Sequence, residues 1–328
     1  MGWANALIGQ FLYNRDESNH HVQVMGFRIP LRVPFRGVAQ REGVLIKGPE
    51  GWGEYSPFPG YSDGREDLCL EAALESACRP WPAPLRDAIP VHVTVPALAP
   101  DEAFKLVIGS GCSSAKVKVA EGDDEGRVEA VRHALGPHGK ISIDANAAWN
   151  LDEAALKIKI LSRHGLEFVE QPVATIEEMA KLRRLVDVAL AADEIASTPD
   201  QAARVAEHEA ADVLVVKVQN YGGVREAVRA IGVSGLPAVV SSLIETSVGI
   251  SAGVALAAAL PELRFPCGLG TLGILAGDVS SDPLLPEAGY VSVRRPGVDH
   301  QVIAEFEQDP GLVPGWDKAL AVSAGLTR

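Results

Sequence analysis

The 328-residue sequence has few cysteines, few aromatic residues and no excess of basic residues. A chain of this size does not need disulfides to fold, and it contains no Cys-x-x-Cys pair, so we expect reduced thiols and a cytoplasmic location. No apolar run reaches the length of a transmembrane helix. The formal charge of −13 argues against a nucleic-acid-binding protein and against adhesion to anionic membranes. The four cysteines are Cys69, Cys78, Cys112 and Cys267.

The first 21 residues have no basic segment followed by a clear signal-peptide cleavage site. A modest apolar stretch is followed by His20 and His21, a pair also found in purification tags. We therefore set residues 1–21 apart from the fold as an extension. It is either a remnant of cloning or a native segment that packs on a partner.

The middle of the chain alternates short apolar runs with segments of helical periodicity. Regular alternation of strands and helices predicts a parallel sheet of the α/β class, and eight strands predict its closure into a barrel. No clean amphipathic helix follows the last strand, so we expect a TIM-like (β/α)7β barrel over residues 89–276. The predicted strands are 91–95, 115–119, 141–145, 167–170, 188–193, 213–218, 238–242 and 263–267.

The two ends of the chain lack this alternation. Near the N-terminus, residues 22–30, 43–47 and 52–55 are predicted strands, and residues 67–78 are predicted to be helical. The tail from residue 277 is punctuated by prolines and poor in strand pattern. We expect residues 22–88 and 277–328 to form one α+β capping domain.

Three acidic residues lie near the ends of three successive predicted strands: Asp144, Glu170 and Asp193. Any one of them alone is more commonly a helix cap or a surface charge. Three carboxylates that converge repel one another unless a cation holds them, and hard oxygen ligands select Mg²⁺. The joint pattern therefore indicates one Mg²⁺ site at the barrel mouth. Glu194 should point away from this site, because side chains alternate along a strand.

Lysines flank the acids along the sequence. Lys116 and Lys118 share one face of the second strand, and Lys217 ends the sixth strand, across the barrel. If the shared face points inward, Lys116 lowers the pKa of Lys118, and Lys118 can act as a base. The alternative is a strand with two solvated lysines. With Lys217 opposite Lys118, the pattern predicts a site with one amine on each side of a substrate.

Four further residues are candidate supporting groups. Asn146 shares the strand face of Asp144. Ser241 and Ser242 end the seventh strand and could donate hydrogen bonds to a carboxylate, although a plain strand end fits equally well. Arg36 could supply the local cation that a small anionic carboxylate substrate needs in a net-negative protein, the alternative being an exposed surface arginine.

Five motifs occur in matching order along the barrel, and together they resemble the enolase superfamily, muconate-lactonising subgroup. The resemblance implies that Asp144, Glu170 and Asp193 bind Mg²⁺ and that Lys118 and Lys217 are the acid/base pair. It also implies that residues 34–37 and 53–58 are specificity loops of the capping domain. The motifs are Lys116-x-Lys118, Asp144-x-Asn146, Phe168-Val-Glu170-Gln-Pro172, Ala192-Asp193-Glu194 and Val216-Lys217.

Within this subgroup the chain most resembles the actinobacterial o-succinylbenzoate synthases, in residues 31–37, 51–54, 241–247 and 268–271. That resemblance implies a Mg²⁺-dependent lyase of menaquinone biosynthesis. Such an enzyme dehydrates 2-succinyl-6-hydroxy-2,4-cyclohexadiene-1-carboxylate to 2-succinylbenzoate through an enediolate and syn elimination, with Lys118 as the base. Ala147 stands where relatives often have glycine, and the eighth strand has no Asp-x-Asp, which counts against dipeptide epimerases.

Two alternatives stay open. The same residues fit an N-succinylamino acid racemase, in which both lysines carry protons. A non-catalytic barrel that serves as a binding module is the alternative from another class. The sequence sets no oligomeric state.

Overall fold

A seven-stranded parallel sheet forms the centre of the computed structural model, which describes residues 23–35, 37–61 and 64–317. The strands follow the order β11-β10-β9-β8-β7-β6-β5, so each strand pairs with its neighbour in sequence. All pairs run parallel, as strands connected by helices require. The strands are β5 Val93–Val95, β6 Ser114–Lys118, β7 Lys140–Asp144, β8 Leu166–Glu170, β9 Ala189–Ala192, β10 Val213–Lys217 and β11 Ala238–Ser241.

The sheet closes through a short eighth segment. Cys267 forms a parallel bridge with Val91, and Gly268 forms one with Ser241. The predicted eighth strand at 263–267 is therefore wrong in extent, because residues 263–266 are not in a strand. Pro266 has no N–H to donate to a ladder, which is consistent with pairing that starts only after it. The predicted barrel architecture is otherwise confirmed.

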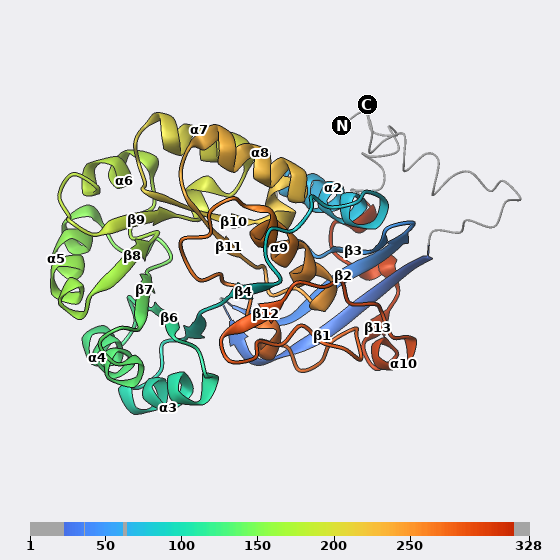
Figure 1. Cartoon of the computed structure of the whole chain (residues 1–328), viewed down its shortest axis with the longest axis horizontal. Coiled ribbons are helices and arrows are strands. Elements are labelled where there is room, and N and C mark those ends of the chain that lie inside the picture. The colour runs from blue at the N-terminus through green and yellow to red at the C-terminus, as the bar shows by residue number, and fades with distance from the viewer. Residues whose placement is uncertain (1–22, 36, 62–63, 318–328) are drawn as a thin grey trace, which may run out of the picture.

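Helices follow the strands and cover the outer side of the sheet, as the left half of Figure 1 shows for α3 to α8. Thr175 caps α6 by accepting a hydrogen bond from Glu178 N, and Pro199 opens α7. The helices are α3 Pro100–Ser110, α4 Asp124–Leu135, α5 Leu151–Leu161, α6 Ile176–Leu182, α7 Pro199–Glu207, α8 Val224–Ser234 and α9 Ser247–Ala259. Short 3-10 turns are η2 Ser162–His164, η3 Glu194–Ala196, η4 Val218–Tyr221 and η5 Thr271–Ile274.

A second sheet, on the right of Figure 1, joins the two ends of the chain. It is antiparallel, in the order β13-β1-β2-β3, and Gly26 on β1 pairs with Gln308 on β13. The tail thus returns to the N-terminal part, as expected. The domain boundaries stay a prediction. Its elements are β1 Gln23–Phe35, β2 Val38–Gly48, β3 Gly51–Tyr55, α2 Arg65–Cys78, α10 His300–Ile303, β13 Glu307–Gln308 and η6 Pro310–Leu312, and a two-stranded ribbon pairs β4 Ala88–Pro90 with β12 Tyr290–Ser292.

Two apolar clusters hold these parts together. The barrel core is formed largely by the inner faces of the helices and by strands such as β10, which is buried on both faces and reads as a continuous apolar run. A second cluster packs Phe27 and Ile29 of β1 with Ile244, in the loop after β11. The capping sheet therefore contacts a loop at the barrel mouth.

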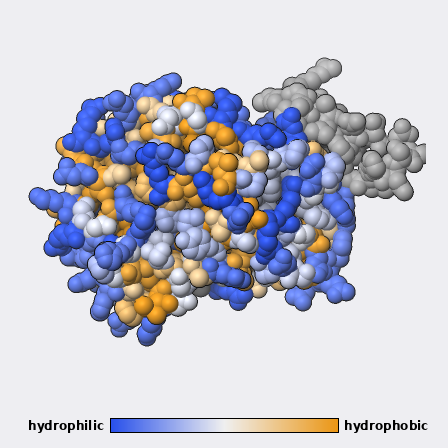
Figure 2. All heavy atoms as spheres, viewed as in Figure 1, coloured by the Kyte–Doolittle hydropathy of each residue, from blue (hydrophilic) through white to orange (hydrophobic). Residues whose placement is uncertain are grey.

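Hydrophilic side chains line the outer rim of the helices, and hydrophobic ones are interspersed among them toward the middle of the face in Figure 2.

Among the described residues, no helix combines the length and the apolar character needed to cross a bilayer.

Candidate active site

A cavity of about 400 Å³ is lined by the carboxyl ends of the barrel strands and by the capping sheet. This is the end of a barrel at which enzymes carry their reacting groups. Of the residues predicted from the sequence and described in the structure, all except Asn146 line the cavity: Lys116, Lys118, Asp144, Glu170, Asp193, Lys217, Ser241 and Ser242. The capping sheet and the segment after it contribute Phe35, Phe58 and Tyr61.

The structure brings the three predicted acids together. Asp144 and Glu170 occupy paired positions on β7 and β8, and Asp193 follows the end of β9. All three are buried, with exposures of 1%, 1% and 3%. Neighbouring parallel strands end at one edge, so consecutive strand-end acids converge.

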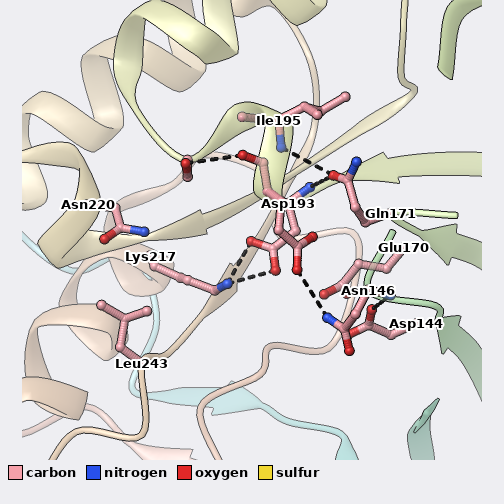
Figure 3. A network of polar contacts seen from close by, with 12 residues as sticks. Asp144, Asn146, Glu170, Gln171, Asp193, Ile195, Lys217, Asn220 and Leu243 are labelled. Atoms are coloured by element: carbon pink, nitrogen blue, oxygen red, sulfur yellow. Dashed lines mark hydrogen bonds and ion pairs between the residues drawn. The ribbon is translucent and has the colours of Figure 1, made fainter. Parts of the chain in front are cut away.

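Each acid forms an ion pair with a lysine, and Asp144 also lies within 3.5 Å of a second one, Lys116. Lys116 Nζ lies 2.9 Å from Glu170 Oε1, and Lys118 Nζ lies 2.5 Å from Asp144 Oδ2. On the other side, Lys217 Nζ donates to both oxygens of Asp193 at 2.6 and 2.7 Å (Figure 3). The lysines of β6 therefore point inward, and amines approach the acids from β6 and from β10, across the barrel.

Burial and the neighbouring charges shift the pKa values of two of the acids and of Lys116. Burial raises the pKa of Glu170, and the carboxylate of Asp144 raises it further. Burial also opposes ionisation of Asp144, but Lys118 and Lys116 outweigh it and hold the pKa of Asp144 below its usual range. Burial disfavours the ammonium of Lys116, yet Glu170 and Asp144 raise its pKa above the ordinary value. Lys116 is thus an ammonium, which is the charge expected beside Lys118.

The donor set fits a hard divalent cation. Three buried carboxylates converge, and burial, followed by the charge of Asp144, raises the pKa of Glu170; a bound cation would offset both effects. Over residues 23–35, 37–61 and 64–317, no three carboxylate, histidine or cysteine side chains already stand in the arrangement of a metal site. In this structure each of the three carboxylates is instead paired with a lysine ammonium.

A second layer of polar residues supports the acids. Asn146 Oδ1 accepts from Lys118 Nζ at 2.7 Å. Its Nδ2, whose dashed line is visible in Figure 3, donates to Glu194 Oε1 at 3.1 Å. Glu194 also lines the cavity, so the expectation that it points away is wrong. Strand alternation ends at Ala192, and Glu194 begins the turn η3.

Gln171 is a supporting residue to which the sequence reading assigned no role. Its Oε1 accepts from the backbone N of Asp193 at 3.0 Å and of Ile195 at 3.3 Å, and its Nε2 donates to Val173 O (Figure 3). It has a φ of 39°, in the left-handed region. Gln171 therefore fixes the backbone that carries Asp193. Its position directly after a buried strand-end acid was the available signal.

The remaining predicted residues lie at the cavity edge. Ser241 pairs in register with Lys217, and Ser242 Oγ shares a hydrogen bond of 2.7 Å with Thr271 Oγ1. Arg36 lies outside the described residues, so its role stays a prediction. Its neighbour Phe35 reaches the cavity, with its ring centroid 5.4 Å from Lys118 Nζ.

Comparison with known proteins gives the family. An enolase C-terminal domain-like model matches residues 99–305, and an enolase N-terminal domain-like model matches residues 26–77. The o-succinylbenzoate synthase of Thermobifida fusca is 52% identical over 302 residues, which cover 90% of this chain and 94% of that protein. The chain belongs to the o-succinylbenzoate synthase family of the enolase superfamily. The resemblance inferred from the motifs is confirmed.

Two further relatives agree with this family. The o-succinylbenzoate synthase of Mycolicibacterium smegmatis is 43% identical, with 81% of this chain and 84% of that protein covered. The fold matches that of a muconate lactonizing enzyme from Pseudomonas fluorescens with a TM-score of 0.77, at 20% identity, over 88% of this chain and 98% of that one. Members of the enolase superfamily generally use Mg²⁺.

Proposed function

We propose that this chain is a Mg²⁺-dependent o-succinylbenzoate synthase, a carbon–oxygen lyase of menaquinone biosynthesis. It dehydrates 2-succinyl-6-hydroxy-2,4-cyclohexadiene-1-carboxylate to 2-succinylbenzoate. The observation that carries the proposal is the 52% identity to the T. fusca o-succinylbenzoate synthase over nearly the whole length of both chains. The paired lysines and acids around the cavity supply the groups that this reaction needs.

Asp144, Glu170 and Asp193 would hold the Mg²⁺. When bound, the ion supplies positive charge beside the substrate carboxylate and lowers the cost of the negative charge that develops on proton removal. Gln171 and Asn146 hold the backbone and side chains around the three acids. Each acid is now paired with a lysine, so we expect ion binding to release lysine ammonium groups toward the substrate.

Lys118 is the group we assign as the base. Its amine is held at the cavity surface by Asp144 Oδ2 and Asn146 Oδ1. Lys116, paired with Glu170, keeps a positive charge nearby, and Lys118 takes the α-proton as the neutral amine. The resulting ammonium of Lys118 then gives its proton to the departing hydroxyl on the same face, so the elimination is syn.

Lys217 approaches from β10, on the side opposite Lys118. Burial disfavours its ammonium, but Asp193 and Glu194 raise its pKa above the ordinary value. It therefore stays protonated and stabilises negative charge on the substrate. The same opposed lysines also fit an N-succinylamino acid racemase. Exchange of the α-proton of an N-succinylamino acid in D₂O would reveal that second activity.

The setting of the reaction belongs to the same proposal. All four cysteines are free, which supports a reducing cytoplasmic compartment. The ammonium groups in the cavity support capture of a small anionic carboxylate despite the net negative charge of the chain.

The decisive test is absorbance-monitored turnover of the cyclohexadiene carboxylate. We expect turnover with Mg²⁺, loss with EDTA, and recovery when Mg²⁺ is restored. Lys118→Ala should lower kcat by about 10²–10⁴-fold, the usual worth of general acid–base catalysis. Lys105→Ala, an exposed lysine on α3, is the matched control and should leave kcat unchanged.

Lys118→Arg sharpens this test, since arginine stays protonated and cannot act as a base. If that variant still exchanges the substrate α-proton with solvent at the wild-type rate, Lys118 is not the base. Absence of turnover by the wild-type protein with Mg²⁺ would contradict the proposed function as a whole.

A further inference from the structure

A small niche lies in the cavity wall where the barrel closes. The bridges Ser241–Gly268 and Val91–Cys267 place Ser241, Gly268 and His92 at adjacent positions, and all three line the cavity. A Cβ atom at Gly268 would lie 2.6 Å from Ser241 Oγ and 3.4 Å from His92 Nε2. Residue 268 has no side chain, and any side chain there would crowd both polar groups, so glycine keeps the cavity side of His92 and Ser241 uncovered.

His92 presents a hydrogen-bond acceptor to this niche. The side chain is 4% exposed, and its Nε2 has no hydrogen-bond partner among the described residues. The ring is hydrogen-bonded to the backbone of Pro266. Proline has no N–H, so the ring must donate to the Pro266 carbonyl through Nδ1. Nε2 is therefore the unprotonated nitrogen of a neutral imidazole.

The surroundings keep this ring neutral. Burial lowers the pKa of His92 to about 3, and the positive charge of Lys116 acts in the same direction. A buried acceptor without a donor carries a desolvation cost, so such atoms in folded proteins are normally satisfied. The niche therefore fits a ligand group that donates a hydrogen bond.

We propose that His92 Nε2 accepts a hydrogen bond from the leaving hydroxyl of the substrate and positions it for elimination. This inference rests on the proposed function. On the cyclohexadiene carboxylate, the two carboxylates and the ketone only accept hydrogen bonds, so the ring hydroxyl is the one donor. A hydroxyl that donates to His92 turns its lone pairs away from the imidazole and leaves them available to the ammonium of Lys118.

The position of His92 agrees with this role. His92 precedes β5, which pairs with β6, and the register of the two strands places Thr94 opposite Lys116. His92 shares the strand face of Thr94. The proposed acceptor and the proton donor Lys118 therefore belong to neighbouring strands that line one cavity.

The elimination balances with His92 as an acceptor alone. Lys118 takes the α-proton, and the electron pair of that C–H bond becomes the new ring double bond. The pair of the C–O bond leaves with the oxygen, Lys118 returns its proton to that oxygen, and water departs. The hydroxyl becomes a stronger donor as it gains this proton, so its hydrogen bond to His92 is stronger in the transition state than in the bound substrate.

The test separates hydroxyl departure from proton removal. The Mg²⁺-loaded enzyme is incubated with the substrate in D₂O, and both product formation and deuterium at the α-carbon of recovered substrate are measured. His92→Phe should lower kcat by roughly 10–100-fold, the effect of one lost hydrogen bond at a reacting group. The ratio of exchange to elimination should rise, because proton removal continues while hydroxyl departure slows. His92→Gln, which can restore an acceptor, should recover part of both effects.

Two further variants complete the test. Gly268→Ala fills the niche while residue 92 stays histidine, and it should raise the same ratio of exchange to elimination. This variant provides the test if His92→Phe fails to fold. His164→Phe removes an imidazole outside the cavity whose Nε2 also has no partner among the described residues, and it should change neither quantity. A purely structural defect lowers exchange and elimination together, so an unchanged ratio in His92→Phe and Gly268→Ala would overturn the role of His92. Wild-type turnover alongside that result would leave the proposed function intact.

Discussion

The molecule buries two groups of carboxylates and neutralises them differently. The mouth cluster consists of Asp144, Glu170 and Asp193, and the three lysines that pair with them are Lys116, Lys118 and Lys217. The sealed cluster consists of Glu54 on β3 and Glu245 after β11, with the single arginine Arg41 beside them. Of these two clusters, only the mouth cluster has acids that line the cavity.

The groups that donate hydrogen bonds to Glu54 in the sealed cluster are short side chains or backbone N–H groups. Glu54 accepts from Ser56 Oγ at 2.6 Å, Thr246 Oγ1 at 2.5 Å and Gly249 N at 2.9 Å. The last two groups belong to the N-terminal end of α9, so a carboxylate of the capping sheet caps a barrel helix. The partners of the mouth cluster are long lysine side chains, which are able to move to a ligand. The sealed cluster therefore fixes structure, whereas in the proposed function the mouth cluster exchanges its lysine partners for Mg²⁺ and substrate.

Arg41 connects the sealed cluster to the shape of the cavity. It donates to the carbonyls of Ser56, Pro57 and Ile244, and its guanidinium lies 5.2 Å from the ring centroid of Phe58. Ile244 has a φ of 62°, which is rare for a β-branched residue and costs energy unless its surroundings hold it. Both Ile244 and Phe58 line the cavity. Arg41 thus holds two walls of the active site from outside it.

The largest expected effect comes from removing this arginine. Arg41→Met removes the positive charge near Glu245 and leaves three backbone carbonyls without their donor, so we expect the free energy of unfolding to fall by about 3–5 kcal/mol. Urea denaturation of the wild type and the variant measures this loss.

Arg28→Met is the matched control for Arg41→Met. Arg28 is about half exposed and pairs with Glu42 at 2.8 Å. Removing an exposed pair of this kind should cost about 0–1 kcal/mol. Equal losses in the two variants would show that the sealed cluster contributes no more than a surface pair.

The second prediction concerns the mouth cluster. Mg²⁺ at about 100 times its Kd should stabilise the wild type by about 2.7 kcal/mol, because the ion binds the folded state. Glu170→Gln should abolish this gain, so the variant should be equally stable with Mg²⁺ and with EDTA. In EDTA it should be less stable than the wild type, because the buried ammonium of Lys116 loses the carboxylate that lies 2.9 Å away. Thermal unfolding with Mg²⁺ and with EDTA gives both quantities.

Glu167→Gln is the control for this second prediction. Glu167 lies on the same strand, pairs with Lys140 at 2.9 Å, and does not line the cavity. It should keep the full response to Mg²⁺. A full response in Glu170→Gln would remove Glu170 from the proposed ligand set.

The mouth cluster could be predicted from the sequence because its residues occupy equivalent places in a repeating unit. Strands buried on both faces read as short apolar runs, and the acids follow these runs directly. Glu194 was placed wrongly because strand alternation stops where η3 begins. His92 carried a usable signal, since the alternation over residues 91–95 puts it on one face with Thr94, which lines the cavity.

The sealed cluster could not be predicted from the sequence. Arg41, Glu54 and Glu245 come from β2, β3 and the loop after β11, and no local spacing relates them. Their contact depends on how the capping sheet packs on the barrel. The short extent of the eighth strand could not be predicted for a similar reason. It depends on which backbone groups meet Val91 and Ser241 where the barrel closes.

The last expected effect, and the smallest when it is taken per pH unit, is a pH dependence of the sealed cluster. Burial raises the pKa of Glu54 from an ordinary 4.5 to about 7, and Glu245 raises it further in the same direction. The folded state therefore binds a proton that the unfolded state releases between these two values, so this group lowers stability as the pH rises through that window, by up to about 1.4 kcal/mol per pH unit. Glu54→Gln should flatten the change in unfolding free energy between pH 5 and pH 8, measured by urea denaturation. Four donated hydrogen bonds favour the ionised carboxylate. If the two proteins show the same pH dependence, these bonds outweigh burial, and Glu54 is a charged cap of α9 throughout this range.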